Sequence, residues 1–363
     1  MSRRHFSALL IASLVMAGLV ALLIPVQSDK DTAGGTILLE SAKTEINDVT
    51  HLRITGGGGA PVSNVSRSET AWTIDELDGY PADWRKLKTL LTSLAEARIL
   101  ETKTSNPEYY SRLGVEDISA EGAQSTLLEF SLGGGDFGVI SGNEETSRGG
   151  QYVRMANQAR SLLIDRELNL DPEPISWADD EIIDIGSALV AAMEISHPDG
   201  DSIRIHKVSA DETDFLLVNM PEGRELVSSW SVNSLANNFS SLRMDAVKPS
   251  SGTDYEDPVK VRLLTFSGLE IHAEIFEQDE RGWISLVASS PESSVSLAED
   301  SLVEDPSADD PLAEAAGEQV AEQAESIRRK TSGWIYRLPA SKFDSMTKRL
   351  EALLKSADEN SES

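Results

Sequence analysis

The side chains that most often carry out catalysis are few and scattered in this sequence. The histidines are His5, His51, His197, His206 and His272. None is three or four residues from another, the spacing that places two imidazoles on one helix face as metal ligands. The absence of cysteine excludes disulfides, thiolate metal sites and cysteine nucleophiles. The chain also lacks a Gly-x-Ser-x-Gly elbow, a Walker loop and a His-Glu-x-x-His motif. We therefore expect no catalytic residue, no metal site and no cofactor.

One predicted hairpin brings two of these histidines near each other. His197 and His206 flank the turn signal that contains Asp199-Gly200-Asp201, and they could face each other across the hairpin. Two imidazoles without a third ligand make a weak metal site, and the Asp-Gly-Asp sequence lacks the remaining ligands of an EF-hand loop. We interpret the histidines as surface or strand residues.

A polar, glycine-rich loop between two predicted strands contains the one candidate binding face. The loop runs from Ser141 to Gly150, and the strand after it begins Gln151-Tyr152-Val153-Arg154. Because alternate residues of a strand point to the same side, Tyr152 and Arg154 project together. This pair is the predicted binding face, and a solvated strand face without a ligand is the alternative.

The charge of the chain narrows the possible partners. Its formal net charge is -29 and its isoelectric point is near 4.5. The resulting field repels phosphate backbones and anionic lipid headgroups, so we expect no nucleic-acid partner. Hydrophobic residues make up 40% of the sequence, which is enough for a folded core.

The N-terminus has the pattern of a membrane anchor. After Arg3 and Arg4, residues 6–24 form an uncharged apolar run. At about 1.5 Å per residue, a helix of this length spans roughly 28 Å, close to the hydrocarbon thickness of a bilayer. The preceding arginines predict a cytoplasmic N-terminus and an external or periplasmic domain, with the protein single-pass in the cytoplasmic membrane. A cleaved signal peptide and a twin-arginine export signal remain alternatives.

The rest of the chain predicts an α+β fold with two similar antiparallel-sheet-plus-helix halves. Alternating segments around Leu52-Arg53-Ile54 and Trp72 precede a helix with a leucine face, and more strands follow. The same order recurs around Met193-Glu194-Ile195, which indicates a tandem duplication. We predict an anchor at 1–25, a tether at 26–36, a first repeat at 37–174 and a second repeat at 175–356.

The second repeat carries a segment of different composition. Residues 289–326 are rich in Glu, Asp, Ser, Ala and Pro and contain neither a basic residue nor an aromatic one. Such a segment buries too little apolar surface to offset the entropy of ordering, so we predict a disordered acidic insertion at 289–326. The polar tail at 357–363 is also predicted to be disordered.

Several motifs together resemble one bacterial family. They are the apolar N-terminus, Leu52-Arg53-Ile54, Ala71-Trp72-Thr73-Ile74, Pro81-Ala82-Asp83, Tyr110-Ser111-Arg112-Leu113-Gly114-Val115 and Gly149-Gly150-Gln151-Tyr152-Val153-Arg154. Across residues 40–290 the chain is similar to the domain of unknown function 4340 family. Members often accompany gliding-type ABC transport components, so the resemblance implies an accessory role in the cell envelope. It implies no catalytic residues.

Three functions follow as hypotheses. The leading one is a non-enzymatic, membrane-anchored periplasmic accessory protein of an ABC-type transport or secretion complex, with a membrane protein as partner. The second is a periplasmic ligand-binding module that uses a groove between the halves. The third is an unrecognised hydrolase. The oligomeric state does not follow from the sequence.

Overall fold

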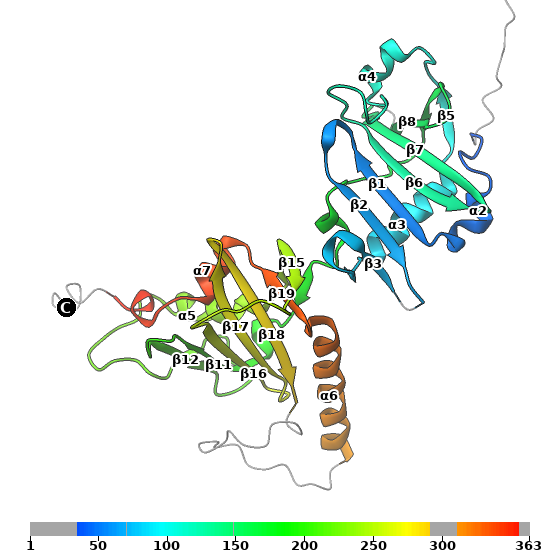
Figure 1. Ribbon diagram of the computed structural model, residues 1–363. Coiled ribbons are helices and arrows are strands. Elements are labelled where there is room, and N and C mark those ends of the chain that lie inside the picture. The colour runs from blue at the N-terminus through cyan, green and yellow to red at the C-terminus, as the bar shows by residue number, and fades with distance from the viewer. Residues whose placement is uncertain (1–34, 70, 148, 291–310, 356–363) are drawn as a thin grey trace, which may run out of the picture.

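The computed structural model describes residues 35–69, 71–147, 149–290 and 311–355. Within these ranges no helix is both long enough and apolar enough to cross a bilayer. The predicted anchor at 1–25, most of the tether and the predicted tail at 357–363 lie outside them. The described chain forms an α+β fold with two antiparallel sheets, each with a long helix on one face (Figure 1).

The first half is built on a nine-stranded antiparallel sheet in the order β4-β3-β2-β1-β6-β7-β8-β9-β5. Its strands are β1 (His51–Gly56), β2 (Val62–Arg67), β3 (Trp72–Ile74), β4 (Tyr80–Pro81), β5 (Ile99–Thr102), β6 (Thr126–Leu132), β7 (Gly135–Glu144), β8 (Gln151–Met155) and β9 (Ser161–Ile164). Gly133 and Gly134, both with positive φ, form the turn between β6 and β7, a conformation that glycine adopts without steric cost.

Helix α3 (Trp84–Glu96) covers one face of this sheet. The helix begins at Asp83, whose carboxylate accepts a hydrogen bond from the Arg85 amide and caps the first turn. Leucines at three- and four-residue spacing make its buried face: Leu87, Leu90, Leu91 and Leu94. They meet alternate residues of β1, where Leu52 and Ile54 are buried and Arg53 is exposed. The predicted strand and helix patterns of this half are therefore present.

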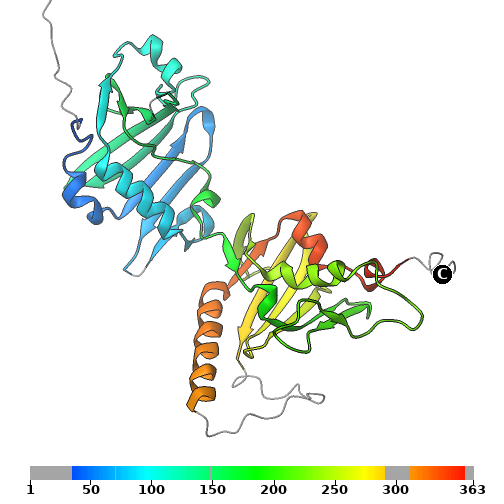
Figure 2. The ribbon, with the colours of Figure 1, turned by 180° about the vertical axis from the view of Figure 1, so that it is seen from behind.

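The second half has an eight-stranded antiparallel sheet in the order β13-β12-β11-β16-β17-β18-β19-β15. Its strands are β11 (Val190–Ser196), β12 (Ser202–His206), β13 (Leu216–Leu217), β15 (Ala246–Pro249), β16 (Val259–Thr265), β17 (Glu270–Gln278), β18 (Arg281–Ser289) and β19 (Trp334–Arg337). A separate pair joins β10 (Glu181–Ile183) to β14 (Leu242–Arg243). Helices α5 (Ser229–Ala236) and α7 (Ala340–Met346) lie on the face seen in Figure 2.

The two sheets share a strand order. Counting from β3 and from β13, eight consecutive strands of the first sheet occur in the same sequence-relative order as the eight strands of the second. In each half, the long helix follows the third strand of this set and precedes the strand that closes the far edge. In the view of Figure 1 both sheets turn toward the reader the face that α3 or α5 leaves open, and Figure 2 shows the helices in front.

The junction of the halves is a packed contact. The Asp83 amide donates to the Trp177 carbonyl at 2.8 Å, and Ala82 and Ala178 form an isolated β-bridge. Tyr80 of the first half packs edge-on against Trp334 of the second, with ring centroids 5.0 Å apart. The predicted boundary at 174 falls inside a segment that continues to pack on the first half as far as residue 178.

The prediction of disorder throughout 289–326 is wrong at both ends. Ser289 is the last residue of β18, and helix α6 (Pro311–Thr331) includes residues 311–326. Val320 and Ala324, four residues apart, are buried in the core. The helix forms because alanine, glutamate and glutamine favour helix and because this narrow apolar stripe packs beside β18. Residues 291–310 lie outside the described part of the chain.

Candidate functional site

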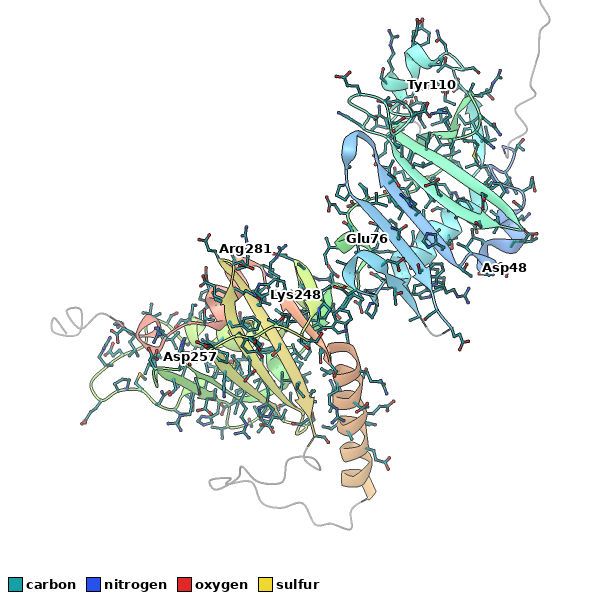
Figure 3. The ribbon with its side chains drawn as sticks, viewed as in Figure 1. Asp48, Glu76, Tyr110, Lys248, Asp257 and Arg281 are labelled. Atoms are coloured by element: carbon teal, nitrogen blue, oxygen red, sulfur yellow. The ribbon has the colours of Figure 1, made fainter. Side chains whose placement is uncertain are left out.

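The two residues of the predicted binding face, Tyr152 and Arg154, do lie on the same side of β8. They are on the open face of the first sheet, opposite α3, where the segment containing α4 (Tyr110–Leu113) crosses the sheet. Figure 3 labels Tyr110 in this segment. Tyr152 is half-buried, and its hydroxyl donates to a Glu145 carboxylate oxygen at 2.6 Å.

Arg154 is only 3% exposed, and its guanidinium holds the covering segment in place. Its Nε donates to the Val115 carbonyl at 2.9 Å and one terminal nitrogen to the Gln158 carbonyl at 3.1 Å. The other terminal nitrogen lies 2.6 Å from an Asp117 carboxylate oxygen. The guanidinium carbon also lies 4.6 Å from the centroid of the Tyr110 ring, a cation–π contact. These contacts give Arg154 a structural role and leave little of it for a ligand.

The histidines are not brought together. The His197 ring is buried, with Nε2 3.0 Å from the Lys348 carbonyl, whereas His206 lies opposite Ala192 on β11. His272 Nε2 lies 3.2 Å from a carboxylate oxygen of Glu270. Across the described residues, the structure contains no group of three or more His, Asp or Glu side chains placed to hold a metal ion.

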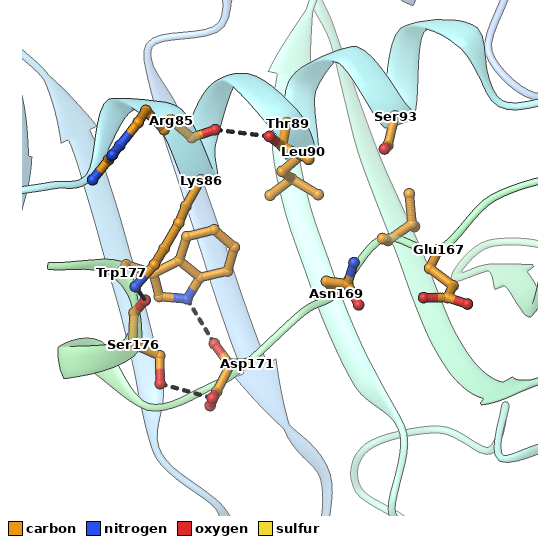
Figure 4. A pocket seen from close by; sticks show the side chains of 11 residues that line it. Arg85, Lys86, Thr89, Leu90, Ser93, Glu167, Asn169, Asp171, Ser176 and Trp177 are labelled. Carbon is orange, nitrogen blue, oxygen red and sulfur yellow. Dashed lines mark hydrogen bonds between the residues drawn. The ribbon is translucent and has the colours of Figure 1, made fainter. Parts of the chain in front are cut away.

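The best-formed cavity lies between α3 and the segment that connects the two halves (Figure 4). Its volume is about 340 Å³, within the range of small-molecule sites. Helix α3 supplies one wall and residues 167–177 supply the other. The lining residues are Arg85, Lys86, Thr89, Leu90, Ser93, Glu167, Leu168, Asn169, Asp171, Ser176 and Trp177.

The connecting wall is held by hydrogen bonds around Asp171. Its carboxylate accepts from the Ser176 hydroxyl at 2.7 Å and from the Glu173 amide at 2.9 Å, while its carbonyl accepts from the Trp177 indole at 2.7 Å. Lys86 of α3 donates to the Ser176 carbonyl at 2.8 Å and joins the two walls. Asn169 has φ of 47°, a left-handed conformation that asparagine tolerates better than most residues. The pocket is thus pre-formed.

The chemistry of this pocket suits binding. Leu90, Leu168 and Trp177 provide an apolar floor, and the charged side chains of Arg85 and Glu167 lie at the exposed rim. An apolar ring or chain with one polar group is the class of molecule that such a lining accepts. Sequence reasoning missed the site because its walls are about 80 residues apart in the chain and share no motif.

The comparisons with known proteins identify a family. The family described as a domain of unknown function, number 4340, matches residues 72–263, a span that includes α3, the connecting segment and the first four strands of the second sheet. No curated protein and no solved structure matches the chain. Because the match covers more than half of the sequence, this protein belongs to the domain of unknown function 4340 family.

Proposed function

We propose that this protein is a non-enzymatic accessory subunit of an envelope transport complex, anchored by residues 1–25 in the cytoplasmic membrane with its two halves on the outer side. The partner that we propose is an integral membrane protein of an ABC-type system. The apolar run behind basic residues supports the anchor, and the family supports the choice of system only through the company its members keep.

The observation that carries the proposal is an exposed apolar edge on the second half. Strand β13 is an edge strand of two residues, and Leu216 beside it on the surface is 51% exposed. Val218 and Val208 are 55% and 69% exposed. Clustered apolar side chains on a sheet edge are typical of protein contact sites, because the edge also offers unpaired backbone groups. In an acidic protein, such an edge suits a protein surface better than anionic lipid.

A photocrosslinking experiment tests this contact. A photoreactive residue placed at Val218 in the full chain is expected to capture a transport-complex subunit in intact cells. The same residue at Lys88, exposed on α3, is the matched control. Capture of the same proteins from both positions would contradict the proposal. Protease treatment of spheroplasts tests the topology separately, since an outer domain is digested there and a cytoplasmic one is protected.

We also propose that the two halves arose by tandem duplication. The support is the shared strand order and the position of the long helix in each half. Shared register at the central strands adds to it: Leu52 and Ile54 are buried around Arg53 on β1, as Met193 and Ile195 are around Glu194 on β11.

The second candidate function, ligand binding, is favoured by the pocket between α3 and the connecting segment. A thermal-shift screen of small amphiphilic molecules tests it, and a Ser93→Phe variant that fills the cavity is the matched control. A ligand of this pocket raises the melting temperature of the native chain and leaves the variant unchanged. A shift that persists in the variant would place the binding elsewhere.

A further inference from the structure

The open faces of the two sheets carry corresponding rows of side chains. The first row crosses β2, β1, β6 and β7 and ends beside β8, and it consists of Asn64, Arg53, Glu129, Gly138 and Ala156. The second row crosses β12, β11, β16, β17 and β18, and it consists of Arg204, Glu194, Arg262, His272 and Val287. Because the strands share an order, each member of one row has a partner at the same register position of the other.

The charges at these positions are inverted between the halves. On β1 and β6, Arg53 and Glu129 lie opposite each other, with Nε and Oε2 3.7 Å apart. On β11 and β16 the corresponding residues are Glu194 and Arg262. An arginine therefore corresponds to a glutamate, and a glutamate to an arginine, at the centre of the two faces.

The rest of each row is also complementary. Asn64, which donates to a carboxylate oxygen of Glu76, corresponds to the exposed cation Arg204. Figure 3 labels Glu76 on the first half, in the view that shows the open faces. Gly138, which has no side chain, corresponds to the imidazole of His272. The exposed Ala156 corresponds to Val287, which is 54% exposed.

The exposed charges of the two faces differ in sign. The exposed acids of the first face are Asp75, Glu76, Glu129 and Asp136, and Arg53 is its exposed arginine. On the second face, Arg204 and Lys260 are exposed.

The acids of the second face are less accessible. Glu270 is buried against Arg262 and His272. Glu274, which is half-buried, accepts a hydrogen bond from the Tyr255 hydroxyl. The second face therefore presents cations in a chain whose net charge is -29.

We propose that the first face of one copy packs on the second face of another copy, so that the two rows lie over each other strand on corresponding strand. In this register Arg53 meets Glu194 and Glu129 meets Arg262, while His272 lies over Gly138. Sheets that pack face to face are about 10 Å apart, a separation that such side chains span.

The arrangement closes as a two-fold dimer. Both open faces of one copy point the same way in Figure 1, so a second copy turned over and reversed end for end meets both at once. Each ion pair then occurs twice. The proposal does not depend on the transport role, because it concerns contacts between copies of this chain alone.

Crosslinking gives a direct test, because the chain has no cysteine of its own. Ser66 lies one row along β2 from Asn64, and Ser202 lies at the corresponding place on β12, so the dimer brings Ser66 of one copy over Ser202 of the other. A mixture of the full-length variants Ser66→Cys and Ser202→Cys, treated with a short bismaleimide, is expected to give a covalent dimer. Each variant alone is expected to give none. Crosslinking of either variant with itself, or none in the mixture, would overturn the proposal.

Charge reversal gives the second test, by sedimentation of the full chain in detergent. Arg262→Glu places like charges opposite Glu129 at two symmetric sites and is expected to weaken the dimer about a hundredfold. Adding Glu129→Arg restores the pair and the dimer, whereas Lys88→Glu on α3 leaves affinity unchanged. Higher salt is expected to weaken the native dimer. A chain that is monomeric at low salt, or a dimer indifferent to Arg262→Glu, refutes the packing.

Discussion

Replacing Arg154 with methionine tests whether this residue is structural or a ligand-binding group. Methionine keeps an apolar body against the Tyr110 ring and removes the guanidinium. The Val115 and Gln158 carbonyls then lose charge-assisted hydrogen bonds, each of which contributes about 1.5–3 kcal/mol. Asp117, with a side chain 66% exposed, regains water and adds at most about 1 kcal/mol. Partial rehydration of the carbonyls lowers the sum, so we expect a loss of about 3 kcal/mol.

Urea denaturation followed by tryptophan fluorescence measures this loss, read on the transition of the first half because two halves need not unfold together. Hydrogen exchange should show the earliest loss of protection in residues 106–123, which Arg154 holds against the sheet. Asp117→Asn is the control, and we expect it to cost less than about 1 kcal/mol. A cost for Arg154→Met below that of the control would refute the structural role, as would unchanged exchange in this segment.

Three further predictions concern other parts of the fold. Gly150→Ala should cost about 2 kcal/mol or more by chemical denaturation, because Gly150 has φ of 104° and a Cβ there lies 2.0 Å from a β9 carbonyl oxygen, whereas Gly186→Ala, with open space, should cost far less. Val320→Asp should expose α6 to protease at a cost of about 2–4 kcal/mol, because it buries an unpaired charge. Hydrogen bonding to Arg224 holds the pKa of Glu351 below its ordinary 4.5, so this contact stabilises the fold above pH 4.5 and is lost as the pH falls through the folded pKa; Glu351→Gln should flatten that part of the acid-denaturation curve.

Local pattern in the sequence was enough to predict much of the secondary structure. Alternation around Leu52 and Met193 predicted strands, and leucine spacing after Asp83 predicted α3 with its cap. These signals are readable because they depend on one element meeting one core. The order of strands within each sheet was not predicted, since register depends on partners distant in the chain.

What covers a face was decided only by the tertiary structure. The sequence placed Tyr152 and Arg154 on one side of a strand, but it contained no sign that residues 106–123 would fold over that side and bury the arginine. It also could not indicate that Val320 and Ala324 would find a core, so composition alone suggested disorder. Periodicity reports which residues share a face, whereas burial and charge pairing depend on segments that the chain brings back from a distance.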